Sequence, residues 1–345
     1  MIHQLFSPCM SHMLSENATQ GRGTSIETIN DRDADIQEAN IQAFRDQNPD
    51  AIIISGPTNN VVGDQVVVAS ATQERTNEAT MDWIHFYATF FNMEGEANRI
   101  AAQMQDSYDC SREVANDIAM QQRELDEFKE PTIMWANYFT YQDLGWSVGE
   151  CPTWDTTYYC EYAAHCGATV LTRPEGMGYN RTWGSPTVYW YLNDEEVLEM
   201  GKDADIFIFS GSDWDSIYAL KNETLDQFKA VQNKMVFDTL GQGPSAWNEQ
   251  RYAEYDVVGL DMCDVVGHTS KTGPGHTRRW FRNVYTEPIG SMPACDVEGG
   301  EISKPFVPPG QECTRPDSSD DSAATSSSMT GSLFALIMIA YAAAL

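Results

Sequence analysis

Aromatic side chains and one arginine are the residues of this sequence whose types and positions best fit a ligand site. They follow segments expected to be strands, where a parallel α/β sheet places its ligand crevice. Rings there can stack on a flat ligand and exclude water, and a guanidinium can pair with an acidic ligand group. The candidate ligand-binding residues are Trp135, Tyr138, Trp146, Trp154, Trp214, Trp247 and Arg251.

Each candidate also has a second interpretation. We expect roughly half of the aromatic rings to pack in the core. Arg251, one helical turn after Trp247, would equally well form a surface ion pair with Glu249 or Glu254. The stronger candidates are those expected in Gly- or Pro-bearing loops, where the core does not need a tryptophan: Trp146, Trp154, Trp214 and Trp247.

The other chemically active groups lack a spacing that identifies a site. The sequence has no Walker loop and no GxGxxG, HExxH or GxSxG motif. Its six histidines are spread without ligand spacing, and packing explains His85 better than catalysis. With 51 acidic residues, a carboxylate pair for acid–base work can always be found, so its presence identifies nothing. We therefore predict no catalytic residue, no metal site and no cofactor.

Composition limits the classes of protein to consider. A 345-residue chain with 42% hydrophobic and 11% aromatic residues has ample material for a core, which excludes disorder for most of it. Its formal net charge of -30 excludes a general nucleic-acid binder, which needs basic surface to replace the counterions of phosphate.

Cysteines and glycosylation motifs favour a secreted protein. None of the eight cysteines forms a CxxC pair, so disulfides explain them better than zinc, although buried free thiols are the alternative. We expect one disulfide among Cys151, Cys160 and Cys166. The acceptor asparagines for N-glycosylation are Asn17, Asn180 and Asn222.

The C-terminal sequence resembles an anchor signal. A polar run rich in Ser, Thr and Asp, residues 313–332, is followed by the largely apolar residues 333–345. Thirteen residues are fewer than the about twenty that span a bilayer. Small residues beginning at Ser322, a polar spacer and an apolar tail are typical of glycosylphosphatidylinositol attachment, with Ser322 as the anchor residue. The first residues lack a signal peptide, so we expect the true start upstream of Met1.

Alternating strand and helix patterns predict an α/β fold with mostly parallel sheets. Residues 80–129 keep helical apolar spacing and form one long helix, or two with a break near Gly95. Asn193 and Glu196 form a capping-box pattern at the start of a helix that ends near Gly201. The other predicted helices are 157–166, 222–232 and 247–266. The predicted strands are 51–54, 66–69, 132–135, 168–171, 205–210 and 235–237.

The same segments resemble a known family. Residues 81–108, MDWIHFYATFFNMEGEANRIAAQMQDSY, are similar to the long helix between the lobes of class III periplasmic binding proteins, the binding proteins for iron chelates and vitamin B12. NPDAIIISG at 48–56 resembles a strand of the N-terminal lobe. LNDEEVLEMGKDADIFIFSGSDW at 192–214 and LDQFKAVQNKMVFDT at 225–239 resemble the C-terminal lobe. The resemblance spans about residues 35–267, and with the anchor and glycosylation motifs it is strongest to algal cell-surface receptors for siderophores or cobalamin.

The resemblance implies two Rossmann-like lobes joined by a rigid interlobe helix, with the N-terminal lobe incomplete in this chain. The expected domains are a partial N-terminal lobe (1–79), the interlobe helix (80–130), the C-terminal lobe (131–290), a stalk (291–332) and the anchor signal (333–345). The implied function is an extracellular, membrane-anchored receptor for a metal chelate or corrinoid that feeds uptake through a surface reductase or transporter.

Two other functions fit the sequence without the family. A secreted hydrolase would use paired carboxylates and tryptophan platforms for sugar, with carboxyl groups roughly 5–10 Å apart. A structural or adhesive surface protein would have a filled cleft without a cavity of ligand size.

Overall fold

The computed structural model describes residues 74–291 with short gaps (91, 125–128, 142–143, 152–156, 181–188, 245 and 270–274), and also residues 39, 41–43, 45–46, 53–55, 66–69, 71 and 313–315. Among the predicted features, Asn17, Trp154, Ser322 and the apolar tail lie outside the described residues. The first two predicted strands are present as a parallel pair, β1 (Ile53–Ser55) and β2 (Val66–Val68).

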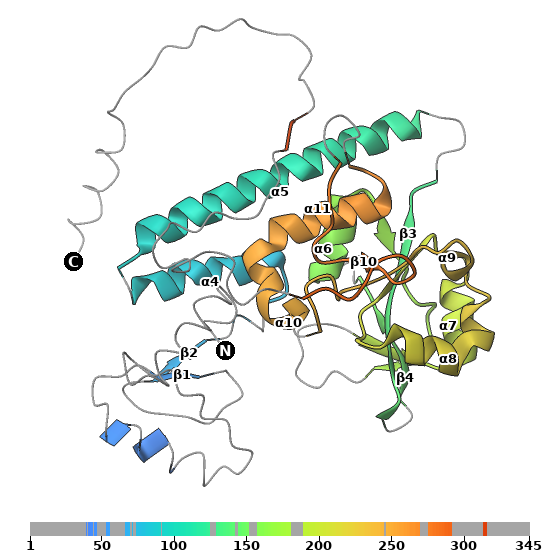
Figure 1. Ribbon diagram of the computed structural model, residues 1–345, viewed down its shortest axis with the longest axis horizontal. Coiled ribbons are helices and arrows are strands. Elements are labelled where there is room, and N and C mark those ends of the chain that lie inside the picture. Colours follow the sequence, from blue (N-terminus) through green and yellow to red (C-terminus); the bar gives the residue numbers. More distant parts are fainter. Residues whose placement is uncertain are drawn as a thin grey trace, which may run out of the picture. The chain divides into compact units, whose positions relative to one another are not determined.

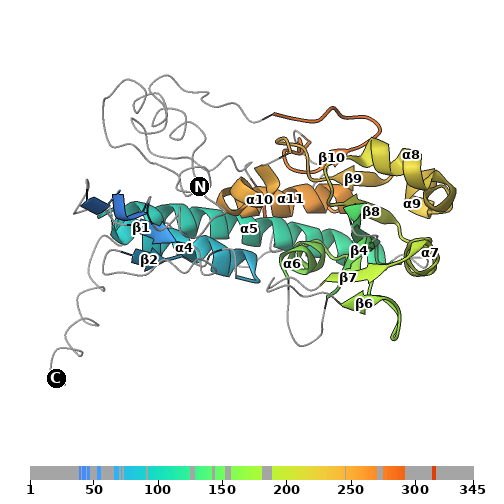
Figure 2. The same cartoon turned by 90° about the horizontal axis from the view of Figure 1, so that it is seen from below.

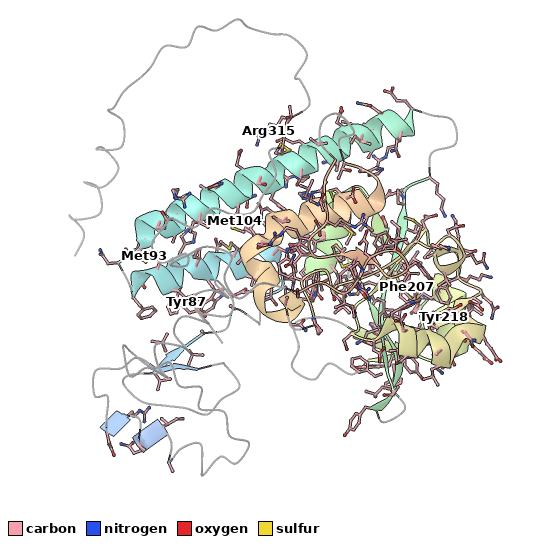
Figure 3. The ribbon with its side chains drawn as sticks, in the orientation of Figure 1. Tyr87, Met93, Met104, Phe207, Tyr218 and Arg315 are labelled. Atoms are coloured by element: carbon pink, nitrogen blue, oxygen red, sulfur yellow. A yellow bond between two sulfur atoms is a disulfide. The ribbon has the colours of Figure 1, made fainter. Side chains whose placement is uncertain are left out.

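The segment predicted as helical over 80–129 forms two helices, α4 (Asn77–Thr89) and α5 (Glu94–Arg123) (Figure 1). This confirms the alternative with a break near Gly95. The Thr76 hydroxyl accepts the Ala79 N–H and so begins α4 with a side-chain cap. The chain turns between the helices through Asn92, whose φ of 54° is left-handed. Met104 points from α5 into a core shared with Met81 and Tyr255 (Figure 3).

An eight-stranded sheet forms the centre of the C-terminal part, with the order β10-β9-β8-β3-β4-β7-β6 and β5 beside the start of β3. The strands predicted from β-branched and aromatic runs pair in parallel. They are β3 (Thr132–Phe139), β5 (Thr169–Val170), β8 (Ile206–Phe209) and β9 (Val236–Asp238). This parallel set, with helices between its strands, confirms the predicted α/β class.

The sheet is nevertheless mixed, because four strands add to it in antiparallel orientation. Gly145 makes the turn into the first of them: its φ is 77°, and a Cβ there would lie 2.7 Å from the Leu192 carbonyl oxygen. The antiparallel strands are β4 (Gly145–Gly149), β6 (Tyr179–Asn180), β7 (Tyr189–Leu192) and β10 (Arg282–Asn283).

Helices cover both faces of the sheet (Figures 1 and 2). One face packs on α6 (Tyr158–His165) and α11 (Tyr255–Val266). The other packs on α7 (Asp194–Gly201), α8 (Trp214–Leu225) and α9 (Lys229–Gln232). The predicted capping box of Asn193 and Glu196 is present at α7. The helix predicted over 247–266 is broken into α10 (Ala246–Gln250), the 3-10 turn η3 (Arg251–Glu254) and α11.

Three disulfides lie among the described residues. Cys151–Cys160 confirms that one pair forms within the 151, 160 and 166 group. Cys166–Cys263 joins the end of α6 to α11. Cys110–Cys313 fixes the segment 313–315 to the middle of α5, where Arg315 also pairs with Asp106 and Glu113 (Figure 3).

Candidate functional site

The parallel strands β3, β8 and β9 end at the same edge of the sheet, because they run in register in one direction. Three connections begin there: a short turn from β3 to β4, residues 210–213 between β8 and α8, and residues 239–245 between β9 and α10. In α/β sheets this edge is where ligands bind. It is also where the sequence places most of the candidate residues.

Arg251 lies in the turn η3, a few residues beyond this edge, and is only 3% exposed. Its guanidinium lies 4.2 Å from the ring centre of Tyr158 and 4.0 Å from that of Tyr252, with the Trp247 ring at 5.2 Å. Nη1 donates to the Trp247 carbonyl oxygen at 2.8 Å. The helix break after Gln250 thus packs the arginine among aromatic rings instead of leaving it in solvent.

The charge of Arg251 has no carboxylate partner within 4 Å among the residues that the structure describes. Its Nε makes no hydrogen bond with any of them. Glu254, one of the two expected surface partners, instead accepts bonds from Arg279 and from the Trp280 indole N–H. A buried cation without an anion is costly, so this side chain is the strongest candidate for contact with an acidic ligand group.

Trp135 and Trp247 lie on the same face of the sheet as Arg251. Trp135 is fully buried in β3 and stacks on Tyr159, with ring centres 5.2 Å apart. Trp247 is 4% exposed and lies 6.1 Å from the Trp135 ring and 5.2 Å from Phe281. Both rings pack in the core on the same face of the sheet as Arg251.

Tyr138, Trp146 and Trp214 belong to the opposite face. Trp146 is fully buried and donates its indole N–H to Asp194 at 2.8 Å. Tyr138 meets Trp146 edge to face at 5.0 Å, and Lys221 lies 4.9 Å from the Tyr138 ring while pairing with Asp194. This cluster is partly open to solvent, because Tyr138 and Lys221 are only half-buried.

The candidates therefore form two groups separated by the sheet. Arg251, Trp247 and Trp135 make one group, and Tyr138, Trp146 and Trp214 the other. The loop locations expected for three tryptophans are wrong, since Trp146 is in β4, Trp214 begins α8 and Trp247 is in α10. The Gly and Pro residues near these tryptophans lie at the ends of short strands and helices and do not indicate long loops.

Two tyrosines that the sequence analysis did not select complete the surroundings of Arg251. Tyr158 is the first residue of α6, and Tyr252 follows Arg251 directly. Tyr158 lies in an aromatic-rich stretch of the sequence after β3, whereas Tyr252 carries no pattern that distinguishes it. The structure also leaves Tyr141 70% and Phe139 37% exposed at the end of β3.

A group with metal-ligand chemistry lies in the core, away from this edge. His165, Cys166 and Cys263 bring one ligand atom each within 4.8 Å of one another. The two sulfur atoms form a disulfide, and the imidazole bonds to Ser111 at 2.9 Å. Burial lowers the pKa of His165 to about 3, so the ring is neutral at pH 7. A disulfide supplies no thiolate, so this group holds no metal in the oxidised protein.

The glycosylation and anchor predictions remain untested. The Asn222 side chain is exposed on α8, and Asn180 lies in β6. In the part of the chain that the structure describes, every helix is too short or too polar to cross a bilayer.

Comparisons with known proteins found matches only among solved structures. No family model matches the sequence, and no curated protein does. A TroA-like periplasmic binding protein, FepB, from Veillonella parvula is 14% identical at a TM-score of 0.45, covering 79% of this chain and 82% of its own. A periplasmic heme-binding protein from Pseudomonas aeruginosa is 11% identical at 0.46, covering 69% and 78%. The heme-binding protein HutB of Vibrio cholerae is 13% identical at 0.42, covering 70% and 85%. These are periplasmic solute-binding proteins, the class that the sequence resembles.

Proposed function

We propose that this chain is a solute-binding receptor for a small metal chelate that carries an acidic group, of the siderophore-iron or corrinoid kind. The observation that carries the proposal is the buried guanidinium of Arg251, which is packed among aromatic rings and pairs with no carboxylate of the described residues. The sequence resemblance to iron-chelate and vitamin B12 binding proteins supports the same class of ligand.

The surroundings of Arg251 have groups that an acidic chelate needs. A carboxylate or phenolate of the ligand would supply the anion that the desolvated cation lacks. The rings of Tyr158 and Tyr252 lie 4.2 and 4.0 Å from the guanidinium and would limit the water that competes for it. Trp247 fixes the guanidinium through its carbonyl oxygen, so the cation is oriented before the ligand arrives.

Tyr138 is the second part of the proposed site. It lies on β3 at the same edge, and Lys221 places a further positive charge 4.9 Å from its ring. We propose that Tyr138, Trp146 and Trp214 shape the site from the other face of the sheet. Trp135 supports Trp247 from the core, and Trp154 extends the site.

Isothermal titration with cobalamin, a ferric hydroxamate and haem tests the proposal. The full chain should bind one of the three. Arg251→Gln should lower the affinity for that ligand by about 10–100-fold, because a charge-assisted hydrogen bond is lost. Arg251→Lys should recover part of the affinity, since an ammonium keeps the charge without the planar fork.

Arg99→Gln is the matched control, because Arg99 is an exposed arginine of α5 paired with Glu96. It removes the same charge and should leave the affinity within about twofold. Melting temperatures of all variants separate lost binding from lost folding. Binding of none of the three ligands would contradict the receptor function. Unchanged affinity in a folded Arg251→Gln protein would contradict the role of Arg251 but not the receptor function.

We further propose that the receptor is anchored at the cell surface through Ser322, is glycosylated at Asn17, Asn180 and Asn222, and passes its ligand to a surface reductase or transporter. Release of the full chain from intact cells by a phosphatidylinositol-specific phospholipase, lost in Ser322→Trp, tests the anchor.

A further inference from the structure

A groove with one acidic wall, that of α4, lies between α4 and α5, helices that run side by side in both views (Figures 1 and 2). Its volume is about 260 Å³. We call it the α4–α5 groove. Its lining residues are Glu78, Met81, Asp82 and His85 of α4, Asn98, Ala101, Ala102 and Gln105 of α5, and Tyr255 of α11.

The groove exists because of two residue patterns. Glu78, Asp82 and His85 recur at helical spacing and share one side of α4. On the facing side of α5, Ala101 and Ala102 are small and leave room between the helices. The floor is fixed, since Met81 is 4% and Tyr255 is 2% exposed, and the Tyr255 hydroxyl donates to Gln105 at 2.9 Å.

The charge of the groove is negative and largely uncompensated. No lysine or arginine lines it. Among the described residues, the one ionic neighbour of its carboxylates is His85, whose Nδ1 lies 3.7 Å from Asp82 Oδ1. The side chain of Asp82 is 69% exposed and accessible from solvent. An apolar floor beside one acidic wall is complementary to an alkyl chain that ends in a cation.

We propose that the α4–α5 groove receives a lysine or arginine side chain of a protein partner. The alkyl stem would lie on Met81, Ala101 and Ala102, and the charged end would bond to Glu78 and Asp82. The acidic groups of the groove do not converge as metal ligands, because His165, Cys166 and Cys263 are the described set that does. One open groove offers little contact to a free amine, so we expect the basic side chain to belong to a polypeptide that adds contacts around the groove.

Titration of the full chain with a tetralysine peptide at low salt tests this proposal. The Glu78→Gln/Asp82→Asn protein should bind the peptide at least about tenfold more weakly. The matched control is Glu199→Gln/Asp203→Asn, which removes two exposed charges on and after α7. It should bind within about twofold of the unchanged protein, because screening limits the effect of distant charges. Equal weakening in both proteins would mean attraction by net charge alone and would overturn the proposal.

A second variant tests the shape of the groove without changing charge. Ala102→Leu places an isobutyl group in the groove at an exposed helix position, where leucine is a good helix former. It should reduce tetralysine binding by about tenfold and leave the melting temperature nearly unchanged. Full binding by this variant would show that the peptide lies elsewhere and would overturn the proposal. Arg251→Gln should leave peptide binding intact, which separates this site from the ligand site.

Discussion

Burial sets the charge of one carboxyl group in the first turn of α11, that of Asp256, which is 1% exposed. Burial raises its pKa to about 6. Neither carboxylate oxygen has a hydrogen-bond partner among the described residues that would oppose the shift. Below its ordinary value of 3.8 the group is protonated in the folded and the unfolded chain. As pH rises through about 6, the folded chain must ionise a buried group, and stability is lost.

Asp256→Asn should therefore raise the free energy of unfolding at pH 7.5 by on the order of 1–3 kcal/mol. At pH 3 the same substitution should have little effect, because the wild-type carboxyl is then protonated in both the folded and the unfolded chain. Urea unfolding at the two pH values measures the difference. An equal effect at both would mean that Asp256 acts through packing and not through its charge.

The residue types in the sequence selected Arg251 as a candidate, but they did not predict how its surroundings are arranged. Arg251 was identifiable from its position one turn after Trp247, but its burial depends on the 3-10 turn that ends α10. A continuous helix over 247–266 fits the apolar spacing equally well, so the sequence does not reveal this break. The two tyrosine neighbours follow from tertiary packing, which no local pattern encodes.

At the scale of elements, the connection after β9 is held by close backbone packing. Gly241 and Gly290 touch, such that a Cβ on Gly290 would lie 1.7 Å from the Gly241 carbonyl oxygen. The Gly290 N–H donates to Leu240, and the Gly241 N–H donates to Trp280. These contacts fix the segment that leads into α10 and Arg251.

Gly290→Ala should lower the free energy of unfolding by roughly 2–4 kcal/mol, because the backbone must separate to admit the methyl group. Thermal unfolding measures this loss. Gly275→Ala is the control, since a Cβ there meets nothing within 4 Å and the substitution should be nearly neutral. Similar losses in both proteins would argue against the close contact as the cause.

Elements with a strong local pattern were predictable. The capping box begins α7 where Asn193 and Glu196 indicate it, and the runs of β-branched and aromatic residues became the parallel strands. The antiparallel strands β4, β6 and β7 were missed. Their aromatic and Gly-rich sequences resemble loops. β4 pairs with β3 just before it, whereas the pairing of β7 with β4 joins segments about 40 residues apart, which no local pattern encodes.

At the scale of the whole molecule, two disulfides close loops of very different length. Cys110 and Cys313 are 203 residues apart, whereas Cys151 and Cys160 are 9 apart. A cross-link stabilises by restricting the unfolded chain, and the restriction grows with the loop.

Replacing Cys110 and Cys313 together by serine should therefore lower the free energy of unfolding by about 4–5 kcal/mol. Replacing Cys151 and Cys160 by serine should lower it by about 2–3 kcal/mol, because the closure entropy varies with the logarithm of loop length. Guanidinium unfolding of the two double variants compares them directly. A larger loss for the short loop would mean that native contacts outweigh loop closure.

The attachment of residues 313–315 to α5 also determines how this protein responds to a mechanical pull. A force applied to the chain after Arg315 passes through the Cys110–Cys313 bond into the middle of a 30-residue helix. The residues between 291 and 313 are bypassed, so tension does not peel β10 from β9 at the edge of the sheet. Helix α5 therefore bears the traction, and the edge strand β10 does not.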